Sequence, residues 1–340
     1  MVLVTGGTGF IGSHVVRELI LRNMRVRVLL RKKAVTKNIQ GLPIEVAYGD
    51  LLHLDSLRSA LRGVKHVFHV AALFSFWPAR KDFIFKVNVD GTRNLMEAAM
   101  QEGVNRVIYT STVAAIGATR DPSSPVKEEW EFNLGFTKDP YVLSKKAAEE
   151  VVMEYVRKGL DVVIVNPSGA IGPGDIRPTP TGRLLLSFLN GELPGYIHGG
   201  GNLADVRDIA RGHLLAFERG RPGQRYILGG ENLFIHETLH LFSKATGLSA
   251  PRLRIPYPVA WLYALYEEVY SFVFRREPLL TRATLRGSRF YLFCSSEKAE
   301  KELGYKRSDL TPAVKEAASW FLRNGYIKQR RVSALEHLLS

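Results

Sequence analysis

The chain has 340 residues, of which 46% are hydrophobic and 24% are charged, and its formal net charge is +14. This composition is typical of a soluble globular protein with one large or two modest domains. The only cysteine, Cys294, excludes an internal disulfide and a cysteine-based metal cluster, and it suits a reducing, cytoplasmic setting. We see no signal peptide before the first expected strand.

The net positive charge by itself would suit binding to a nucleic acid or to an anionic membrane. However, the cations are scattered in small clusters, and no nucleic-acid motif accompanies them. The most apolar helical stretch, residues 259–274, is interrupted by Glu267 and Glu268, which argues against a membrane span. We therefore expect no nucleic-acid partner and at most peripheral contact with a membrane.

The first dozen residues predict a phosphate-binding turn. Residues 2–5 form an apolar strand, and residues 13–21 have helical periodicity. Between them, Gly6 permits a tight turn, Gly9 lets the backbone approach a pyrophosphate, and Gly12 lets the helix pack closely on the sheet. The start of the helix then presents N–H groups to the anion. The alternative is an ordinary strand–helix turn with additional glycines.

The segment after the second expected strand, residues 25–30, predicts the type of cofactor. A dinucleotide fold that binds NAD usually has an acidic residue here, but no Asp or Glu occurs between Glu18 and Glu45. Instead, Arg31 begins a run of three cations, which suits a 2′-phosphate. We therefore expect NADP(H), and the alternative is a solvated basic loop with NAD bound elsewhere.

Strands and helices then alternate along the first half of the chain. Further strands are expected at 44–47, 66–70, 106–110 and 161–166, and helices at 55–61, 83–100 and 141–157. This alternation predicts an α/β fold with a Rossmann-type, doubly wound parallel sheet. Asp50 and Leu51 follow the third strand, and the small residues Ala71 and Ala72 follow the fourth.

An aromatic run at residues 73–77 follows the fourth strand, at the carboxyl edge of the sheet, where open α/β folds bind ligands. Phe74 and Trp77 therefore predict an apolar or ring-bearing small-molecule substrate. A packed loop is the alternative.

The composition changes after Pro167, where Gly, Pro and Thr become frequent. We expect an NADP-binding domain at residues 1–166, which a strand near 224–228 rejoins. A smaller, mostly helical substrate-binding domain would cover residues 167–330, and residues 331–340 would form a basic tail.

Tyr141 and Lys145 are four residues apart at the start of a helix, so both project from one face. A neighbouring ammonium favours a phenolate, so we expect Lys145 to lower the pKa of Tyr141 and allow acid–base chemistry near neutral pH. Thr112 follows the preceding strand, and its hydroxyl could hold a substrate oxygen near Tyr141.

At this point the sequence resembles the extended short-chain dehydrogenase/reductase (SDR) superfamily, the epimerase/dehydratase group. The matching pieces occur in family order and cover about the first half of the chain: residues 5–12, 49–51, 70–72, 88–92, 109–112, 141–145 and 166–168. Arg31 is similar to the dihydroflavonol 4-reductase-like branch. Three later stretches look most like bacterial proteins labelled hopanoid-associated sugar epimerases: residues 166–183, 210–220 and 225–232.

The resemblance implies a role for each matched residue. The cofactor would be held by Gly6, Gly9, Phe10, Ile11, Gly12, Arg31, Asp50, Leu51, Ala71, Ala72, Pro167 and Gly169. Thr112, Tyr141 and Lys145 would form the catalytic set, and Tyr141 and Lys145 would also contact the cofactor. Asn88 and Arg183 would join Phe74 and Trp77 around the substrate. The superfamily often forms dimers, so a homodimer is one expectation.

The sequence departs from the family pattern in two places, and the second of them bears on which reaction is expected. Thr112 stands where this branch often has Ser, although the hydroxyl is kept. Val113 and Ala114 follow it, where sugar 4,6-dehydratases use acidic residues, so that reaction is disfavoured.

A rival motif lies at residues 236–240, which read His-Glu-Thr-Leu-His. A zinc protease would use both histidines as ligands and Glu237 as a base. No third ligand is evident at a recognisable spacing, so we expect no metal and interpret this stretch as the polar start of a helix.

The leading hypothesis is an NADP(H)-dependent oxidoreductase that reduces a carbonyl or oxidises the matching alcohol. One alternative is a nucleotide-sugar epimerase with a retained NAD(P), for which Arg183 could supply part of a diphosphate clamp. The other is a non-catalytic protein that senses the dinucleotide, against which the intact Tyr141 and Lys145 argue.

Overall fold

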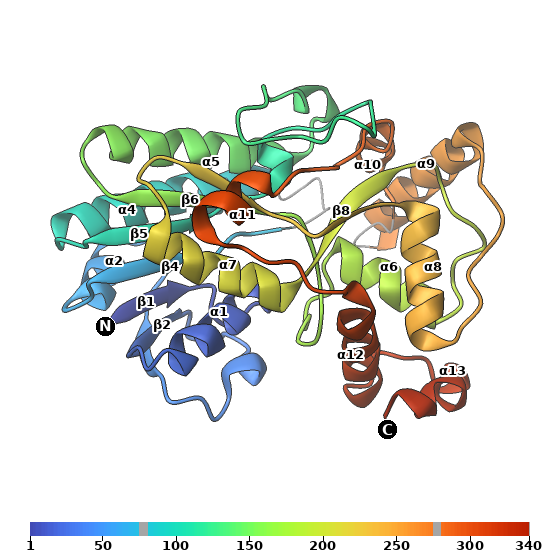
Figure 1. Cartoon of the computed structure of the whole chain (residues 1–340), viewed down its shortest axis with the longest axis horizontal. Helices are drawn as coiled ribbons and strands as arrows, with labels where there is room; N and C mark the ends of the chain where they lie inside the picture. Colours follow the sequence, from blue (N-terminus) through green and yellow to red (C-terminus); the bar gives the residue numbers. More distant parts are fainter. Residues whose placement is uncertain (75–80, 275–279, 340) are drawn as a thin grey trace.

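The computed structural model describes residues 1–74, 81–274 and 280–339, and a seven-stranded sheet forms its centre (Figure 1). The strands are β1 (Val2–Thr5), β2 (Val26–Leu30), β3 (Glu45–Tyr48), β4 (His66–His69), β5 (Arg106–Thr110), β6 (Val162–Pro167) and β9 (Arg225–Leu228). Their order in the sheet is β3-β2-β1-β4-β5-β6-β9, and every neighbouring pair is parallel. The strand expected near residues 224–228 is β9.

Helices cover both faces of this sheet, as a parallel sheet requires. One face carries α1 (Phe10–Leu21), α7 (Val206–Arg219) and α11 (Glu297–Leu303), whose apolar residues share one core with the strands. The other carries α2 (Leu54–Leu61), α4 (Gly91–Gln101) and α5 (Pro140–Arg157). The predicted doubly wound Rossmann-type fold is confirmed. Its winding reverses between β1 and β4, so a ligand crevice is expected at the carboxyl ends of these strands.

The helix expected at residues 83–100 is divided into three pieces. A short helix, α3 (Lys81–Phe85), is followed by a π-helical turn at Lys86–Asp90 and then by α4. Insertions of this kind in a helix are frequent at functional sites. Here the turn contains the buried Asn88.

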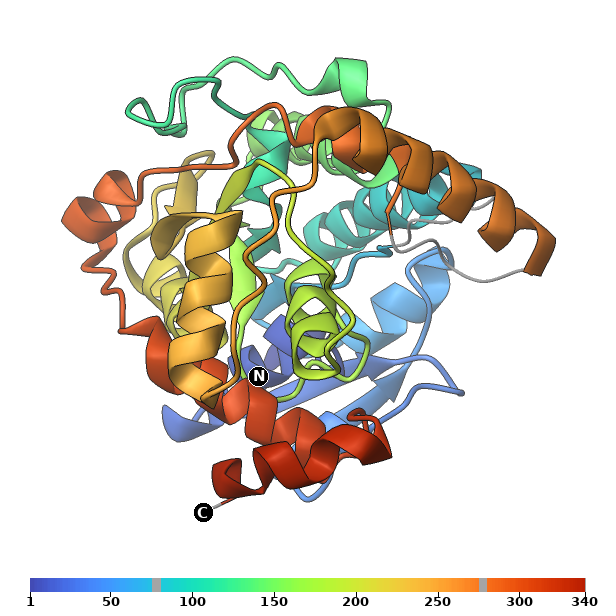
Figure 2. The ribbon, with the colours of Figure 1, turned by 90° about the vertical axis from the view of Figure 1, so that its right-hand side faces the viewer.

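The C-terminal part is mostly helical, but it also contains a small sheet that the sequence did not predict. Its strands are β7 (Gly169–Ile171), β8 (Gly200–Asp205) and β10 (Glu231–Phe234), in the order β10-β8-β7. Around it lie α6 (Pro180–Leu189), α8 (Ile235–Thr246), α9 (Tyr257–Phe274), α10 (Arg282–Gly287), α12 (Leu310–Arg323) and α13 (Gln329–Val332). Figure 2 shows α8, α12 and α13 together on one side and α9 at the outer edge of the molecule.

The C-terminal residues, expected as a basic tail, are instead folded. α13 and a 3₁₀ turn at Ser333–Leu338 return against the small domain, where Leu335 and Leu338 are buried in a shared core with α8 and α12. His337 Nε2 also forms a hydrogen bond with the carbonyl oxygen of Thr246 at 3.0 Å. The burial of these two leucines therefore holds the segment against the fold despite the basic residues of α13. Within the described ranges, no helix combines the length and the apolarity needed to cross a bilayer.

Candidate active site

The turn between β1 and α1 depends on two glycines. Gly6 has a φ of +69°, and a Cβ there would lie 2.7 Å from both the Cα and the amide nitrogen of Ala71. A Cβ on Gly12 would collide with the carbonyl oxygen of Gly6. Any other residue at these two positions would therefore push β4 or α1 away and fill the space above the turn. The cradle fits the pyrophosphate of a dinucleotide.

The start of α1 supplies donors to this cradle. Gly9 caps the helix without a side chain, and the first helical hydrogen bond runs from the Ser13 amide to the Gly9 carbonyl oxygen at 3.0 Å. The amides of Phe10 and Ile11 precede that bond, so they can donate to an anion at the positive end of the helix dipole.

Arg31 lies immediately beyond β2 in an exposed stretch with Lys32 and Lys33. β2 pairs with β1 so that Leu29 is opposite Thr5, which places Arg31 at the same edge of the sheet as the glycine turn. The exposed guanidinium can reach a phosphate there, although solvent and salt will screen the contact.

The ends of β3 and β4 complete this side of the crevice. The Asp50 carboxylate accepts a hydrogen bond from the Leu52 amide at 3.0 Å, while Leu51 is buried. The Ala71 amide donates to the Thr5 hydroxyl at 3.2 Å, and Ala72 is exposed. The structure thus brings these four expected cofactor residues to the carboxyl edge of the same sheet, with β2 and β1 between the two strands that they follow.

The start of α5 fixes the two principal catalytic candidates. The Asp139 carboxylate caps the helix by accepting the amides of Tyr141 at 2.9 Å and Val142 at 3.3 Å, and Pro140 occupies the first turn. Tyr141 therefore lies in the first turn of α5, and Lys145 follows one turn later on the same face.

Lys145 is a buried cation with two partners. Its Nζ donates to the Tyr109 hydroxyl at 2.8 Å and to the Thr110 carbonyl oxygen at 2.7 Å, and the side chain is almost fully buried. Burial lowers the pKa of Lys145 to about 7, although the Glu149 carboxylate partly opposes that shift. A lysine in this environment can change its charge near neutral pH.

The expectation that Lys145 lowers the pKa of Tyr141 is wrong for this structure. Burial, with a smaller contribution from the Asp139 carboxylate, raises the pKa of Tyr141 to about 12. The reason is geometric, because the ammonium donates toward β5, to Tyr109 and Thr110. Tyr141 is consequently a protonated phenol at neutral pH.

Thr112 lies two residues beyond the end of β5 and caps a 3₁₀ turn at Val113–Ala115, which packs against α5. Its hydroxyl oxygen lies 3.4 Å from the Ala114 amide, a long contact that leaves the group able to bond elsewhere. On the other side, Pro167 ends β6 and Gly169 begins β7. These two residues therefore mark the passage from the large sheet to the small one.

Phe74 and Arg183 gather beside Tyr141. The rings of Phe74 and Tyr141 meet edge to face with centroids 4.9 Å apart, and the guanidinium carbon of Arg183 lies 6.0 Å from the Phe74 centroid. Arg183 comes from α6, so residues more than a hundred positions apart converge here. Trp77 lies outside the described residues.

Asn88, expected at the substrate, is instead a structural anchor. It is almost fully buried, its Oδ1 accepts the Leu73 amide at 2.7 Å, and its Nδ2 donates to the Leu73 carbonyl oxygen at 3.0 Å. The same Nδ2 donates to the Ser144 hydroxyl at 3.0 Å. Asn88 thereby ties the segment that carries Phe74 to the helix that carries Tyr141.

Two groups of contacts around the catalytic candidates were not predicted from the sequence. Tyr109, the partner of Lys145, is 36 residues away along the chain. The Asn166 amide group donates to the Thr112 carbonyl oxygen at 3.0 Å and to Glu149 at 2.8 Å, and Glu149 pairs with Arg225 at 2.7 Å. No spacing rule connects these residues, although Tyr109 and Asn166 both belong to motifs on which the family resemblance rests.

The rival zinc motif has a structural explanation. The Glu237 carboxylate accepts the Phe234 amide at 2.8 Å and so caps α8, while the His236 ring stacks on Phe234 with centroids 5.7 Å apart. Both groups are thus used in forming the start of the helix.

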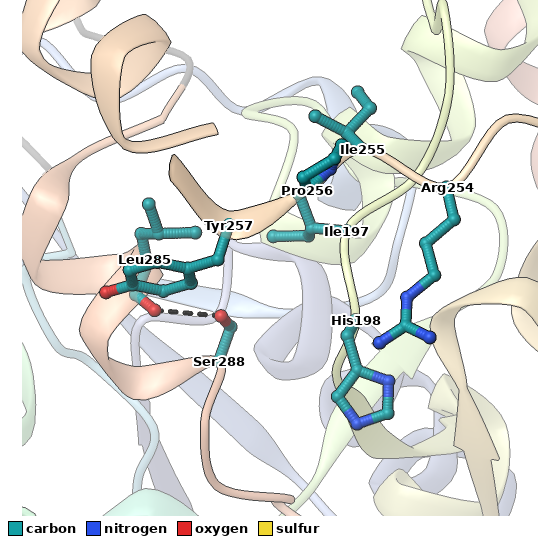
Figure 3. A pocket seen from close by; sticks show the side chains of 8 residues that line it. All are labelled: Ile197, His198, Arg254, Ile255, Pro256, Tyr257, Leu285 and Ser288. Atoms are coloured by element: carbon teal, nitrogen blue, oxygen red, sulfur yellow. Dashed lines mark hydrogen bonds between the residues drawn. The ribbon is translucent and has the colours of Figure 1, made fainter. Parts of the chain in front are cut away.

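A pocket of about 340 Å³ lies in the C-terminal part, between the chain that enters α9 and the start of β8 (Figure 3). Most of its wall is apolar, and its full lining is Ile197, His198, Arg254, Ile255, Pro256, Tyr257, Leu285 and Ser288. The Ser288 hydroxyl donates to the Leu285 carbonyl oxygen at 2.8 Å, and His198 Nε2 shares a hydrogen bond with the Tyr291 hydroxyl at 2.7 Å. None of the site residues expected from the sequence lines it.

Comparison with known proteins agrees with this geometry. Residues 2–229 match the model of the NAD dependent epimerase/dehydratase family. The chain is 40% identical to a Synechocystis sp. protein provisionally named a dihydroflavonol 4-reductase, over 96% of this chain and 95% of that protein. It is 35% identical to sterol demethylase protein B of Methylococcus capsulatus, over 96% and 99%. The crystal structure of gox2253 superposes with a TM-score of 0.85 at 42% identity, covering 96% of this chain and 99% of that one.

The chain therefore belongs to the NAD dependent epimerase/dehydratase family, within the extended SDR group. It is an NAD(P)-dependent enzyme of the extended SDR type.

Proposed function

We propose that this enzyme uses NADPH to reduce the carbonyl group of an apolar, ring-bearing compound. The observation that carries the proposal is the phenol of Tyr141, which packs against Phe74 and has a pKa of about 12. A protonated phenol beside an apolar surface can donate its proton to a carbonyl oxygen, as carbonyl reduction needs.

Bound NADPH would supply the hydride that reduces the carbonyl carbon. Within the chain, the Thr112 hydroxyl would hold the carbonyl oxygen, and Tyr141 would transfer its phenolic proton to that oxygen, giving an alcohol. The Lys145 ammonium would hold the cofactor ribose. Solvent would return a proton to Tyr141 before the next turnover.

The preference for NADPH rests on Arg31, Lys32 and Lys33, with no acidic residue between Glu18 and Glu45. One charge-assisted contact to a phosphate can exceed 1.4 kcal/mol, which is about tenfold in affinity. NADPH should therefore bind at least about tenfold more tightly than NADH in a fluorescence titration. Equal or reversed affinities would remove the basis for the assignment.

The apolar substrate class rests on the edge-to-face contact of Phe74 with Tyr141, which places a hydrophobic surface beside the proton donor. The names of the two relatives also refer to a flavonoid and a sterol, and both kinds of compound contain fused rings. A panel of aromatic and alicyclic aldehydes and ketones tests this class.

A nucleotide-sugar epimerase is the second candidate, because Arg183 lies near Phe74 and could bind a sugar diphosphate. An epimerase restores its cofactor in each cycle and gains by retaining it, whereas a reductase must exchange it. We expect the purified protein to lose its cofactor on gel filtration and to consume NADPH with a hydrophobic carbonyl compound. Retained dinucleotide together with interconversion of sugar epimers would favour the second candidate.

Tyr141→Phe tests the proton donor. It should abolish turnover and leave NADPH affinity nearly unchanged, because it removes a proton donor and little binding surface. A variant that keeps most of its activity would show that Tyr141 is not the acid.

A further inference from the structure

Helix α9 buries small and polar side chains and exposes large apolar ones, which is the reverse of what is expected for a helix surrounded by water. Its buried residues are Ala260, Ala264, Glu267 and Ser271, which are spaced along one face of the helix. Surface helices of globular proteins normally bury large apolar residues and expose polar ones. This face holds three small side chains and a carboxylate.

The opposite face exposes large apolar side chains. Leu262, Tyr266, Val269, Phe272 and Val273 are each between 57% and 80% exposed. Figure 2 shows α9 at the outer edge of the molecule. Large apolar side chains gathered on one exposed face of a helix mark a site for a protein or a membrane.

The two glutamates of α9 do not interrupt the apolar face. Glu267 is buried and accepts a hydrogen bond from the Tyr263 hydroxyl at 3.3 Å. Glu268 accepts two hydrogen bonds from Arg282 of α10, one from the backbone amide and one from Nε, both at 2.7 Å. Both carboxylates therefore have partners within the fold.

The chain on either side of α9 is strongly basic. Residues 248–292 contain seven arginines and three glutamates, and neither lysine nor aspartate. Arg252 and Arg254 are exposed before the helix, and Arg286 and Arg289 are exposed after it. The Arg289 guanidinium carbon lies 4.4 Å from the Tyr257 ring centroid, at the first residue of α9.

We propose that α9 docks on the surface of an anionic lipid bilayer. The helix lies in the interface with its apolar face in the acyl boundary, while the arginines contact lipid headgroups. A second copy of this chain is a poorer occupant, because a two-fold contact through α9 would bring the same arginines together. The proposal does not depend on the carbonyl chemistry.

Sedimentation with vesicles tests the proposal on the full-length protein. It should bind vesicles of phosphatidylcholine with phosphatidylglycerol, bind pure phosphatidylcholine at least about tenfold more weakly, and lose the difference in high salt. The double variant Phe272→Ser/Val273→Ser should weaken binding to the anionic vesicles by at least about tenfold, since two apolar side chains no longer insert.

A matched control removes exposed apolar groups from another face. Val46→Ser/Tyr48→Ser alters two exposed residues of β3 and should leave vesicle binding unchanged. Equal loss in the two double variants would overturn the assignment to α9. So would equal binding to both kinds of vesicle. Absence of vesicle binding would also overturn it, and gel filtration would then show whether α9 joins two copies, through a dimer that Phe272→Ser/Val273→Ser dissociates.

Discussion

Tyr109→Phe tests whether Lys145 acts as a buried cation whose charge the enzyme needs. The variant removes the hydroxyl that accepts a hydrogen bond from Nζ at 2.8 Å and leaves the Thr110 carbonyl oxygen at 2.7 Å. A hydrogen bond to a charged group contributes about 1.5–3 kcal/mol. Since one pKa unit corresponds to about 1.4 kcal/mol, the pKa of Lys145 should fall by about one to two units.

The direction of the pH dependence follows from the protonation state of Lys145 that the enzyme requires. Holding the cofactor ribose needs the ammonium form, so activity is present below the pKa of Lys145 and is lost as the pH rises through it. In the native protein that loss should begin near pH 7, where burial places the pKa of Lys145. The pKa of Tyr141, about 12, is too high to produce a loss in this range.

The assay is the pH profile of kcat/KM for NADPH-dependent reduction. The alkaline limb should move about one to two pH units lower in Tyr109→Phe. Tyr155→Phe is the control, because Tyr155 is another buried tyrosine, whose hydroxyl donates to Glu97 at 3.0 Å. An unmoved limb in Tyr109→Phe, or an equal shift in both variants, would refute the reasoning.

Three further results are expected. Arg31→Ser should weaken NADPH binding about tenfold and leave NADH binding unchanged in a fluorescence titration; equal losses for both cofactors would contradict contact with the 2′-phosphate. Asn88→Leu should lower the free energy of unfolding by about 2–4 kcal/mol in urea, because it removes the partner of the half-buried Leu73 amide and carbonyl groups and one of the hydrogen bonds of the Ser144 hydroxyl, and a stability change near zero would argue against the anchor. Lys145 should make the free energy of unfolding rise with pH between about 7, its pKa in the folded protein, and 10.5, the ordinary pKa of lysine. In this range Lys145 keeps its proton in the unfolded chain but has lost it in the folded one. Lys145→Met should reduce this slope, and an unchanged slope would show that Lys145 does not titrate as stated.

Local sequence was enough where the chain itself builds the site. The order of strand, glycine turn and helix is encoded within residues 2–21, so the cradle around Gly6 and Gly12 was predictable. The four-residue spacing of Tyr141 and Lys145 likewise fixed their common face of α5. Family motifs then placed the ends of β3, β4, β5 and β6 around the crevice.

Contacts between distant segments could not be predicted in this way. From the sequence we expected the Lys145 ammonium to act on Tyr141, but in the folded chain it donates hydrogen bonds to Tyr109 and Thr110. Asn88 looked available to a substrate, because no local pattern reveals that Leu73 and Ser144 occupy its amide.

The C-terminal part was harder for two physical reasons. β7 and β8 begin with glycines and lack a clear alternation of apolar and polar residues, so the pattern did not indicate strands. For α9 the composition predicted an apolar helix, but only packing decides which face is exposed. The buried Glu267 and the exposed Phe272 show that this face is the apolar one.

In the proposed function, Tyr141 protonates a carbonyl oxygen while NADPH reduces the carbonyl carbon. The most direct measurement uses NADPH deuterated at the transferable position of the nicotinamide, with an apolar ring-bearing carbonyl compound as substrate. We predict one deuterium on the alcohol carbon for each NADPH oxidised, and no transfer in Tyr141→Phe. Interconversion of sugar epimers with no net oxidation of NADPH, or deuterium transfer that persists in Tyr141→Phe, would contradict the account.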